Sequence, residues 1–241
     1  MKKILFLLLP VFGLLACNRI TENTILYQNV YGFGDVVSGT EIHFDISDVT
    51  LQVTEDQTDS KWMHEQTIFF LADLIRISAP NTYETRIKMY EPVTRKAALA
   101  KNAADPAVYG TDAVALYQDW GSDPLRRYIN VSCVTTSLKD SETPHTVDLV
   151  WDDVRSNSDT LYLELHHQGH GESYENEDYE ANAFQMDTHY MRFDLAGAIP
   201  PGAGSSIVIS LEWDWFEAAN GLLLRDKPEH RKISGTFYLT D

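Results

Sequence analysis

Positive charge is scarce in this sequence. Its 241 residues include 19 Lys and Arg against 36 Asp and Glu, which gives a formal net charge of −17. Nucleic-acid binding depends on Lys and Arg that neutralise phosphates, so no nucleic-acid partner is expected. The same charge opposes electrostatic adhesion to anionic lipid. Hydrophobic residues make up 44% of the chain, which is enough to build real cores.

Cysteine is almost absent, and the two cysteines present have different contexts. Cys17 follows two lysines and a short apolar run, "ILFLLLPVFGLLA", which is too short to span a bilayer as a helix. This is the pattern of a secretory signal at residues 1–16, and Leu14-Leu15-Ala16-Cys17 matches the lipobox of bacterial lipoproteins. We predict that Cys17 is acylated and anchors the chain by its lipid, and the predicted location is the outer membrane of the cell envelope.

If Cys17 is acylated, Cys133 is the one cysteine with a free thiol, so no intrachain disulfide can form. Its strand context predicts a small buried hydrophobic residue.

Several catalytic signatures are also missing. The segment "HEQTI" at 64–68 lacks the second His of an H-E-x-x-H zinc helix. There is no G-x-S-x-G motif and no phosphate-binding loop. Nothing nominates a pair of carboxylates for hydrolysis. We therefore expect a protein that is not an enzyme and that needs no cofactor.

Alternation of apolar and polar residues dominates the rest of the chain and predicts β-strands. In the first half, Phe44 to Val53 is interpreted as one bulged strand, and Tyr83, Thr85, Ile87 and Met89 share one face. The segment 94–112 is interpreted as a hinge between two domains. The longest alternating row covers 205–217. The prediction is an all-β protein with a tether (17–30), a first β-domain (31–105) and an antiparallel β-sandwich (106–241).

Part of the second half resembles the NigD-like lipoprotein family. The matching positions are Gly110, Asp112, Trp120, Tyr128-Ile129-Asn130, Val147 to Val150, and Asp159 to His167. The sequence departs from the family pattern at His166 and Gln168. The resemblance covers about 110–195 and implies an OB-like N-terminal barrel followed by a C-terminal β-sandwich. It implies no catalytic or ligand-binding residues, although the family name refers to a bacteriocin-immunity role.

One histidine-rich segment is a weak candidate for a metal site. "HHQGHGE" offers His166, His167, His170 and Glu172, whose side chains are suitable ligands for Zn²⁺ or Cu²⁺. Within a strand, His166 and His167 point to opposite faces, so they can share an ion only if the strand breaks there. A strand end followed by a polar turn is the favoured interpretation, and no metal is predicted.

The exposure of the two tryptophans in "EWDWFE" distinguishes two hypotheses about function. Exposed Trp213 and Trp215 would suit a glycan-binding surface, but they continue an apolar row and are predicted to pack in a sandwich core. Asp214 and Phe216 are expected on the exposed face. The leading hypothesis is a non-catalytic envelope lipoprotein, a binding or immunity-type module with a protein partner. A surface glycan-binding lipoprotein is the alternative.

Overall fold

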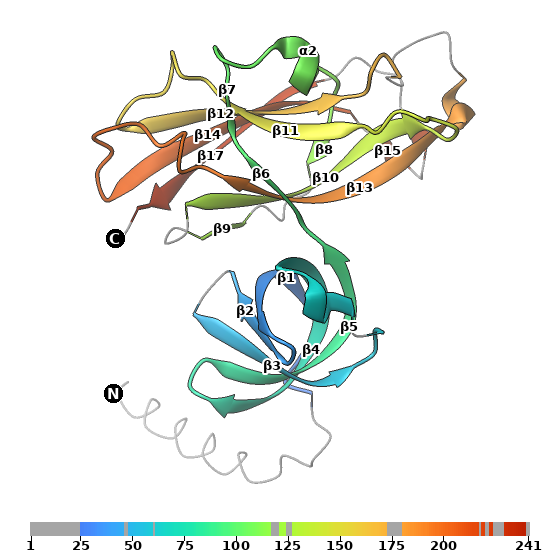
Figure 1. The fold of residues 1–241 in the computed structure, drawn as a ribbon, viewed down its shortest axis with the longest axis vertical. Coiled ribbons are helices and arrows are strands. Elements are labelled where there is room, and N and C mark those ends of the chain that lie inside the picture. The colour runs from blue at the N-terminus through green and yellow to red at the C-terminus, as the bar shows by residue number, and fades with distance from the viewer. Residues whose placement is uncertain are drawn as a thin grey trace, which may run out of the picture.

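The computed structural model describes residues 25–45, 48–59, 61–116, 121–123, 127–172, 180–216, 218–219, 222–223 and 229–239. Two bodies built almost entirely of strands follow one another along the chain (Figure 1). Among these residues no helix is long and apolar enough to cross a membrane. Cys17 lies outside the described residues.

The first body is a closed five-stranded barrel. Its strands are β1 (Tyr27–Ser38), β2 (Glu41–Phe44), β3 (Val49–Asp56), β4 (Thr67–Ala79) and β5 (Thr82–Pro92). They pair in the order β1-β2-β3-β5-β4, and β1 closes the barrel against β4. A closed five-stranded barrel of this kind is the architecture of OB-folds, which confirms the predicted fold class for this half.

The barrel interior is filled by the residues that alternate inward. They are Ile42, Leu51, Val53, Trp62, Ile68, Phe70, Ala72, Leu74 and Ile87. Trp62 comes from the short 3₁₀ helix η2 (Lys61–His64), and its indole N–H donates to Asp56 at 2.8 Å. The interpretation of Phe44 to Val53 as one bulged strand was wrong. Phe44 pairs with Val49 across a turn, so β2 and β3 form an antiparallel hairpin.

The second body is a sandwich of two sheets. One sheet has the order β6-β13-β10-β8, with β9 also on β10, and the other has the order β17-β14-β12-β11-β7. The strands of the first are β6 (Thr94–Ala97), β8 (Ala115–Leu116), β9 (Gly121–Asp123), β10 (Tyr128–Leu138) and β13 (Phe184–Asp194). Those of the second are β7 (Leu99–Ala100), β11 (Thr146–Trp151), β12 (Thr160–Gln168), β14 (Ser206–Trp215) and β17 (Glu229–Tyr238). Shorter elements are α2 (Pro106–Tyr109), η3 (Ala181–Ala183), β15 (Ala218–Ala219) and β16 (Leu222–Leu223).

Alternating aliphatic residues from both sheets form the sandwich core. Ile129, Val131 and Cys133 of β10 face Leu161, Leu163 and Leu165 of β12 and Ile207, Ile209 and Leu211 of β14 within one buried cluster. The rows predicted from the alternation therefore lie inside the core. Burial raises the pKa of the Cys133 thiol to about 12, so this cysteine is an inert core residue, as expected.

The segment predicted as a hinge belongs to the sandwich. β6 pairs in parallel with β13, and β7 pairs in parallel with β11. The sandwich thus begins earlier than the predicted boundary at 106, while β1 begins inside the predicted tether. The reason is that sheet pairing, which local composition does not reveal, recruits strands of only two to four residues, too short to show an alternating pattern.

Candidate functional site

The end of β12 separates the histidines of the "HHQGHGE" segment. Because β12 continues regularly to Gln168, His166 and His167 project from opposite faces of its sheet. His167 is fully buried between the sheets, whereas His166 lies on the outer face with its Nε2 3.2 Å from Glu164 Oε2. His170 follows in an exposed turn with a positive φ of 54°. The predicted candidates therefore divide into an inner and an outer group.

The inner group includes a histidine that sequence reasoning missed. His145 precedes β11, and its Nδ1 lies 3.0 Å from His167 Nε2 and 3.1 Å from the carbonyl oxygen of Thr136. Its other nitrogen, Nε2, lies 3.1 Å from Glu172 Oε2. Burial lowers the pKa of His167 to about 3, with smaller contributions from the neighbouring histidines, so His167 stays neutral at physiological pH. Among the described residues, no group of three or more His, Cys, Asp or Glu side chains is placed to hold a metal ion.

Of the predicted candidates, His166 lines a groove at the second sheet. The groove has a volume of about 180 Å³, and its lining residues are Thr111, Asp112, Glu164, Leu165, His166, Glu212, Trp213, Asp214 and His230. Glu164 of β12 and Glu212 of β14 are directly opposite one another in the parallel register of the two strands.

Basic side chains neutralise both carboxylates. Lys101 Nζ lies 2.6 Å from Glu164 Oε1, and Arg155 Nη2 lies 2.8 Å from Glu212 Oε1. Lys232 Nζ adds a further contact to Glu212 at 3.1 Å. The hydrogen bond with His166, followed by that from Lys101, lowers the pKa of Glu164 to about 2 against the effect of burial. Hydrogen bonds from Arg155 and then Lys232 lower the pKa of Glu212 to about 2 in the same way.

This arrangement does not suit either carboxylate to general acid catalysis near neutral pH. A glycosidase-type site needs one carboxyl group that keeps its proton near neutral pH, and such a group has a raised pKa. Glu164 and Glu212 are both fully ionised at neutral pH and already hydrogen-bonded to cations. The groove lining contains four acidic side chains and two histidines, and Lys101, Arg155 and Lys232 lie beside two of the carboxylates.

A second charged cluster joins the barrel to the sandwich. Arg192 of β13 is almost completely buried and forms ion pairs with Asp35 and Asp45 of the barrel. Its Nε donates to Asn130 Oδ1 at 2.9 Å, and its guanidinium carbon lies 3.9 Å from the centre of the Tyr128 ring. Residues far apart in sequence thus fix one domain against the other.

Asp45 is held from the sandwich side as well. It accepts hydrogen bonds from Tyr128 Oη and Asn130 Nδ2, both at 2.8 Å. Burial raises the pKa of Asp45 above its ordinary value, although Arg192 and the two hydrogen bonds act in the opposite direction. Stacking of Phe69 of the barrel on Tyr190 of β13, with ring centroids 4.2 Å apart, extends the same junction.

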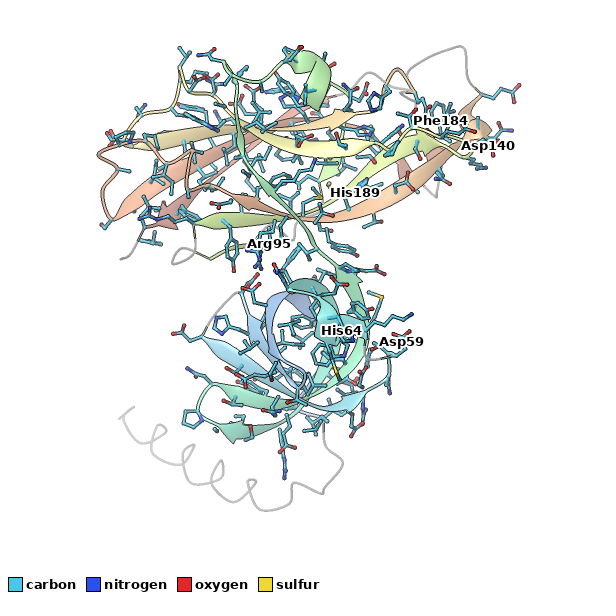
Figure 2. The ribbon with its side chains drawn as sticks, viewed as in Figure 1. Asp59, His64, Arg95, Asp140, Phe184 and His189 are labelled. Atoms are coloured by element: carbon cyan, nitrogen blue, oxygen red, sulfur yellow. The ribbon has the colours of Figure 1, made fainter. Side chains whose placement is uncertain are left out.

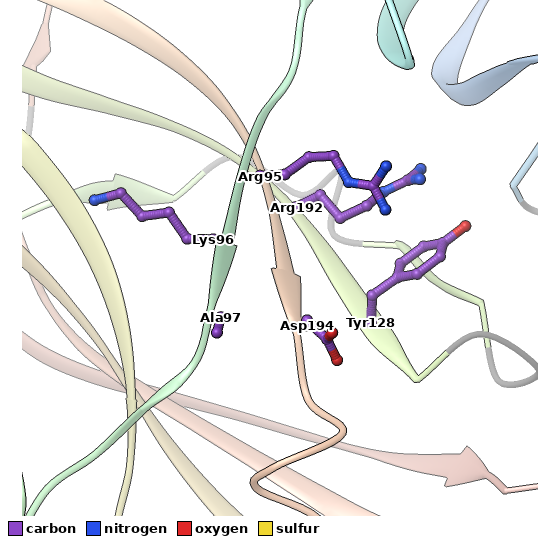
Figure 3. A pocket seen from close by; sticks show the side chains of 6 residues that line it. All are labelled: Arg95, Lys96, Ala97, Tyr128, Arg192 and Asp194. Carbon is purple, nitrogen blue, oxygen red and sulfur yellow. The ribbon is translucent and has the colours of Figure 1, made fainter.

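A cavity of about 270 Å³ lies at the edge of this junction (Figure 3). Arg95, Tyr128 and Arg192 project to one side of β6 and β13, whereas Lys96 points the other way, toward Asp148 at 2.8 Å. Figure 2 shows Arg95 where the chain passes between barrel and sandwich. Since Arg192 is already neutralised by two aspartates, the cavity reflects the structure of the junction and offers no unpaired buried charge to a ligand.

The two tryptophans are half-buried and pack against apolar clusters. Trp213 packs against the main sandwich core and also lines the groove. Trp215 packs against a small cluster that includes Phe216, and Arg231 lies 4.2 Å from the centre of its ring. Asp214 is exposed as expected, but the expectation that Phe216 is exposed was wrong. β14 ends at Trp215, so the strand alternation no longer fixes the direction of the next side chain.

Comparison with known families gives a match to part of the sandwich. Residues 97–192 match the family described as the NigD-like C-terminal beta sandwich domain. The match begins within β6, in agreement with the domain boundary seen in the structure. No curated protein matches the sequence significantly.

Solved structures share the two-domain fold at low sequence identity. A proposed toxin-related protein from Parabacteroides distasonis is 16% identical, with a TM-score of 0.55, over 86% of this chain and 92% of its own. A protein of unknown function from Bacteroides vulgatus is 14% identical, with a TM-score of 0.57, over 86% and 90%. A proposed lipoprotein from Bacteroides fragilis is 11% identical, with a TM-score of 0.54, over 89% and 100%. At these identities the likeness concerns the fold alone.

Proposed function

We propose that this chain, whose second domain belongs to the NigD-like C-terminal β-sandwich family, is a lipid-anchored envelope protein that binds a protein partner without catalysis. The proposed role is protective, of the immunity type that the family name indicates. The anchor is a diacylglycerol on Cys17, and the proposed location is the outer membrane. The groove on the second sheet is the proposed contact surface.

The ionised carboxylates of the groove are the observation that carries this proposal. Glu164 and Glu212 have pKa values lowered to about 2, so neither can donate a proton near neutral pH. Each is surrounded by basic side chains whose positions are fixed by ion pairs. A preorganised array of fixed charges supports specificity and fast association with a complementary protein surface.

The rigid junction gives additional support. A binding module gains affinity when its surfaces are held in place before the partner arrives, because less ordering is then required on binding. The contacts of Arg192 with Asp35 and Asp45 fix the barrel on the sandwich in this way.

Surface glycan binding remains the alternative, and it has less support. Sugar-stacking platforms need exposed aromatic faces, whereas Trp213 and Trp215 pack against apolar clusters. The aromatic face of Trp215 is also contacted by Arg231.

A protection assay tests the proposal. A strain that lacks the gene should be inhibited by culture fluid from competing strains at doses that the parent strain survives, and the intact gene should restore survival. Asp214→Lys reverses a charge in the groove at an exposed position and should abolish rescue without changing the melting temperature. Asp140→Lys is the matched control, because Asp140 is exposed and does not line the groove.

Two results would contradict the proposed function. Full rescue by Asp214→Lys would remove the groove as the contact surface. Hydrolysis of a polysaccharide or peptide by the purified protein, lost in Glu164→Gln, would show that the groove is catalytic.

A further inference from the structure

The barrel end that lies farthest from the sandwich exposes apolar side chains. Leu26 is 44% exposed, Tyr27 is 54% exposed, and Ile77 near the end of β4 is 60% exposed. Ile77 is followed by the exposed residues Ser78, Ala79, Pro80 and Asn81 of the β4–β5 hairpin. Exposed aromatic and aliphatic side chains grouped at one end of a domain indicate a surface that contacts something apolar.

Strand register places these residues opposite the sandwich. Asp35 pairs with Thr67 at the end that Arg192 contacts, and Tyr27 pairs with Leu74 farther along the same two strands. From Thr67 to Ile77 the strand advances ten residues, or about 33 Å at the usual rise. The backbone N–H of Leu26 donates to Leu74 O at 2.9 Å, so the start of β1 and the hairpin share this end.

The charged side chains that contact this end are paired with one another, since Lys88 Nζ, which binds Asn29, lies 2.7 Å from Asp73 Oδ1. Residues 25–31 and 77–83 contain no Asp, Glu, Lys or Arg. Behind the hairpin, Arg76 and Glu84 neutralise one another at 2.6 Å. Asp48 adds one negative charge nearby. It lies two residues before Thr50, whose backbone N–H donates to the carbonyl oxygen of Asn81. The surface therefore suits a neutral apolar interface better than an anionic one.

The distance to the proposed anchor indicates what covers this surface. Cys17 lies nine residues before Leu26, and nine residues reach about 30 Å at most. A lipid on Cys17 therefore holds the start of β1 within that distance of the bilayer. Tyrosine is favoured at membrane interfaces because its ring is apolar and its hydroxyl is hydrated.

We propose that this barrel end, formed by Leu26, Tyr27 and the β4–β5 hairpin around Ile77, docks on the surface of a zwitterionic bilayer. The proposal rests on the acylation of Cys17 given under the proposed function. Docking orients the barrel against the membrane and the sandwich, with its charged groove, away from it. The two acyl chains of a diacylglycerol already hold the protein at the membrane, so the second apolar contact fixes the orientation of the barrel and does not supply the attachment itself.

Site-specific fluorescence tests this contact. The lipidated full-length protein carrying Ile77→Cys is labelled with an environment-sensitive dye and reconstituted into phosphatidylcholine vesicles. Cys133 is buried and stays unlabelled. The matched control is Val154→Cys, a 76% exposed position in the sandwich. The expected result is a blue-shifted emission at Ile77→Cys that lipid-borne quenchers reduce at least about twofold, with water-like emission at Val154→Cys.

Failure of docking and failure of the anchor give different results. If the protein floats with vesicles but the label at position 77 stays water-like, the docking proposal is overturned while the anchor stands. If mass spectrometry finds no lipid on Cys17 and the protein does not float, the anchor fails and the docking proposal fails with it. A blue shift that depends on protein concentration and needs no vesicles would identify a second copy of the chain as the occupant and overturn the proposal.

Discussion

Replacement of Arg192 by leucine should lower the free energy of unfolding, because Arg192 links the barrel to the sandwich. The guanidinium is the partner of two carboxylates, the Asn130 amide and the Tyr128 ring. Leucine retains apolar bulk but leaves Asp45 buried with no cation beside it. Removal of one partner from a buried ion pair costs about 3 to 5 kcal/mol, a large share of the 5 to 15 kcal/mol by which a typical protein is stable.

Urea unfolding measures this loss. With a denaturant dependence of about 3 kcal/mol per M for a chain of this size, the midpoint of Arg192→Leu should fall by about 1 to 1.7 M. Arg76→Leu is the matched control, because its partner Glu84 is reached at the surface, and its midpoint should be nearly unchanged. The double variant Arg192→Leu with Asp45→Asn should recover part of the loss, because no buried charge is then left unpaired.

The reasoning fails if Arg192→Leu unfolds like the parent protein. It also fails if Asp45→Asn adds its own loss to that of Arg192→Leu, since independent losses would mean that the two side chains are not coupled.

Three further outcomes are expected. Cys17→Ala should release a soluble protein from the membrane fraction or leave an uncut precursor, and unchanged mature size with unchanged membrane partitioning would refute the anchor. Trp213→Ala should lower the free energy of unfolding by about 3 kcal/mol, the lower end of the range for a large core aromatic. Thermal unfolding measures this loss, with Tyr238→Ala as the exposed control. A stable variant that has lost polysaccharide binding would instead favour the glycan alternative. His167 has a folded pKa of about 3 against an ordinary value of 6.5, so the free energy of unfolding should fall as the pH drops from 6.5 toward 3. The slope of this free energy against pH should be smaller in His167→Leu. An equal slope in the variant would exclude His167 as the source of the pH dependence.

Local patterns predicted the strands well and the contacts between them poorly. The alternating rows around Cys133 and Leu163 indicated a sandwich core because strand periodicity alone determines which side chains share a face. The same rule predicted that His166 and His167 separate. The NigD-like resemblance gave the second domain and its approximate extent.

The parts that sequence reasoning missed depend on long-range pairing. His145 meets His167 from a different strand, and Glu164 meets Glu212 only through the register of two parallel strands. Arg192 finds Asp45 in the other domain, 147 positions away. The spacing of these residues in the sequence does not predict their contacts, because each contact depends on how whole sheets pair and pack.

The protonation of the groove carboxylates is the most direct test of the claim that this protein binds and does not catalyse. Carboxyl carbon chemical shifts of Glu164 and Glu212, assigned with the help of Glu164→Gln and Glu212→Gln, can be followed by NMR from pH 8 downward. Both groups should remain ionised throughout the range in which the protein is folded and titrate only near pH 2, as their lowered pKa values require. A titration of either group between pH 5 and 7 would reveal a proton-holding carboxyl group suited to general acid catalysis, and would contradict a purely binding role.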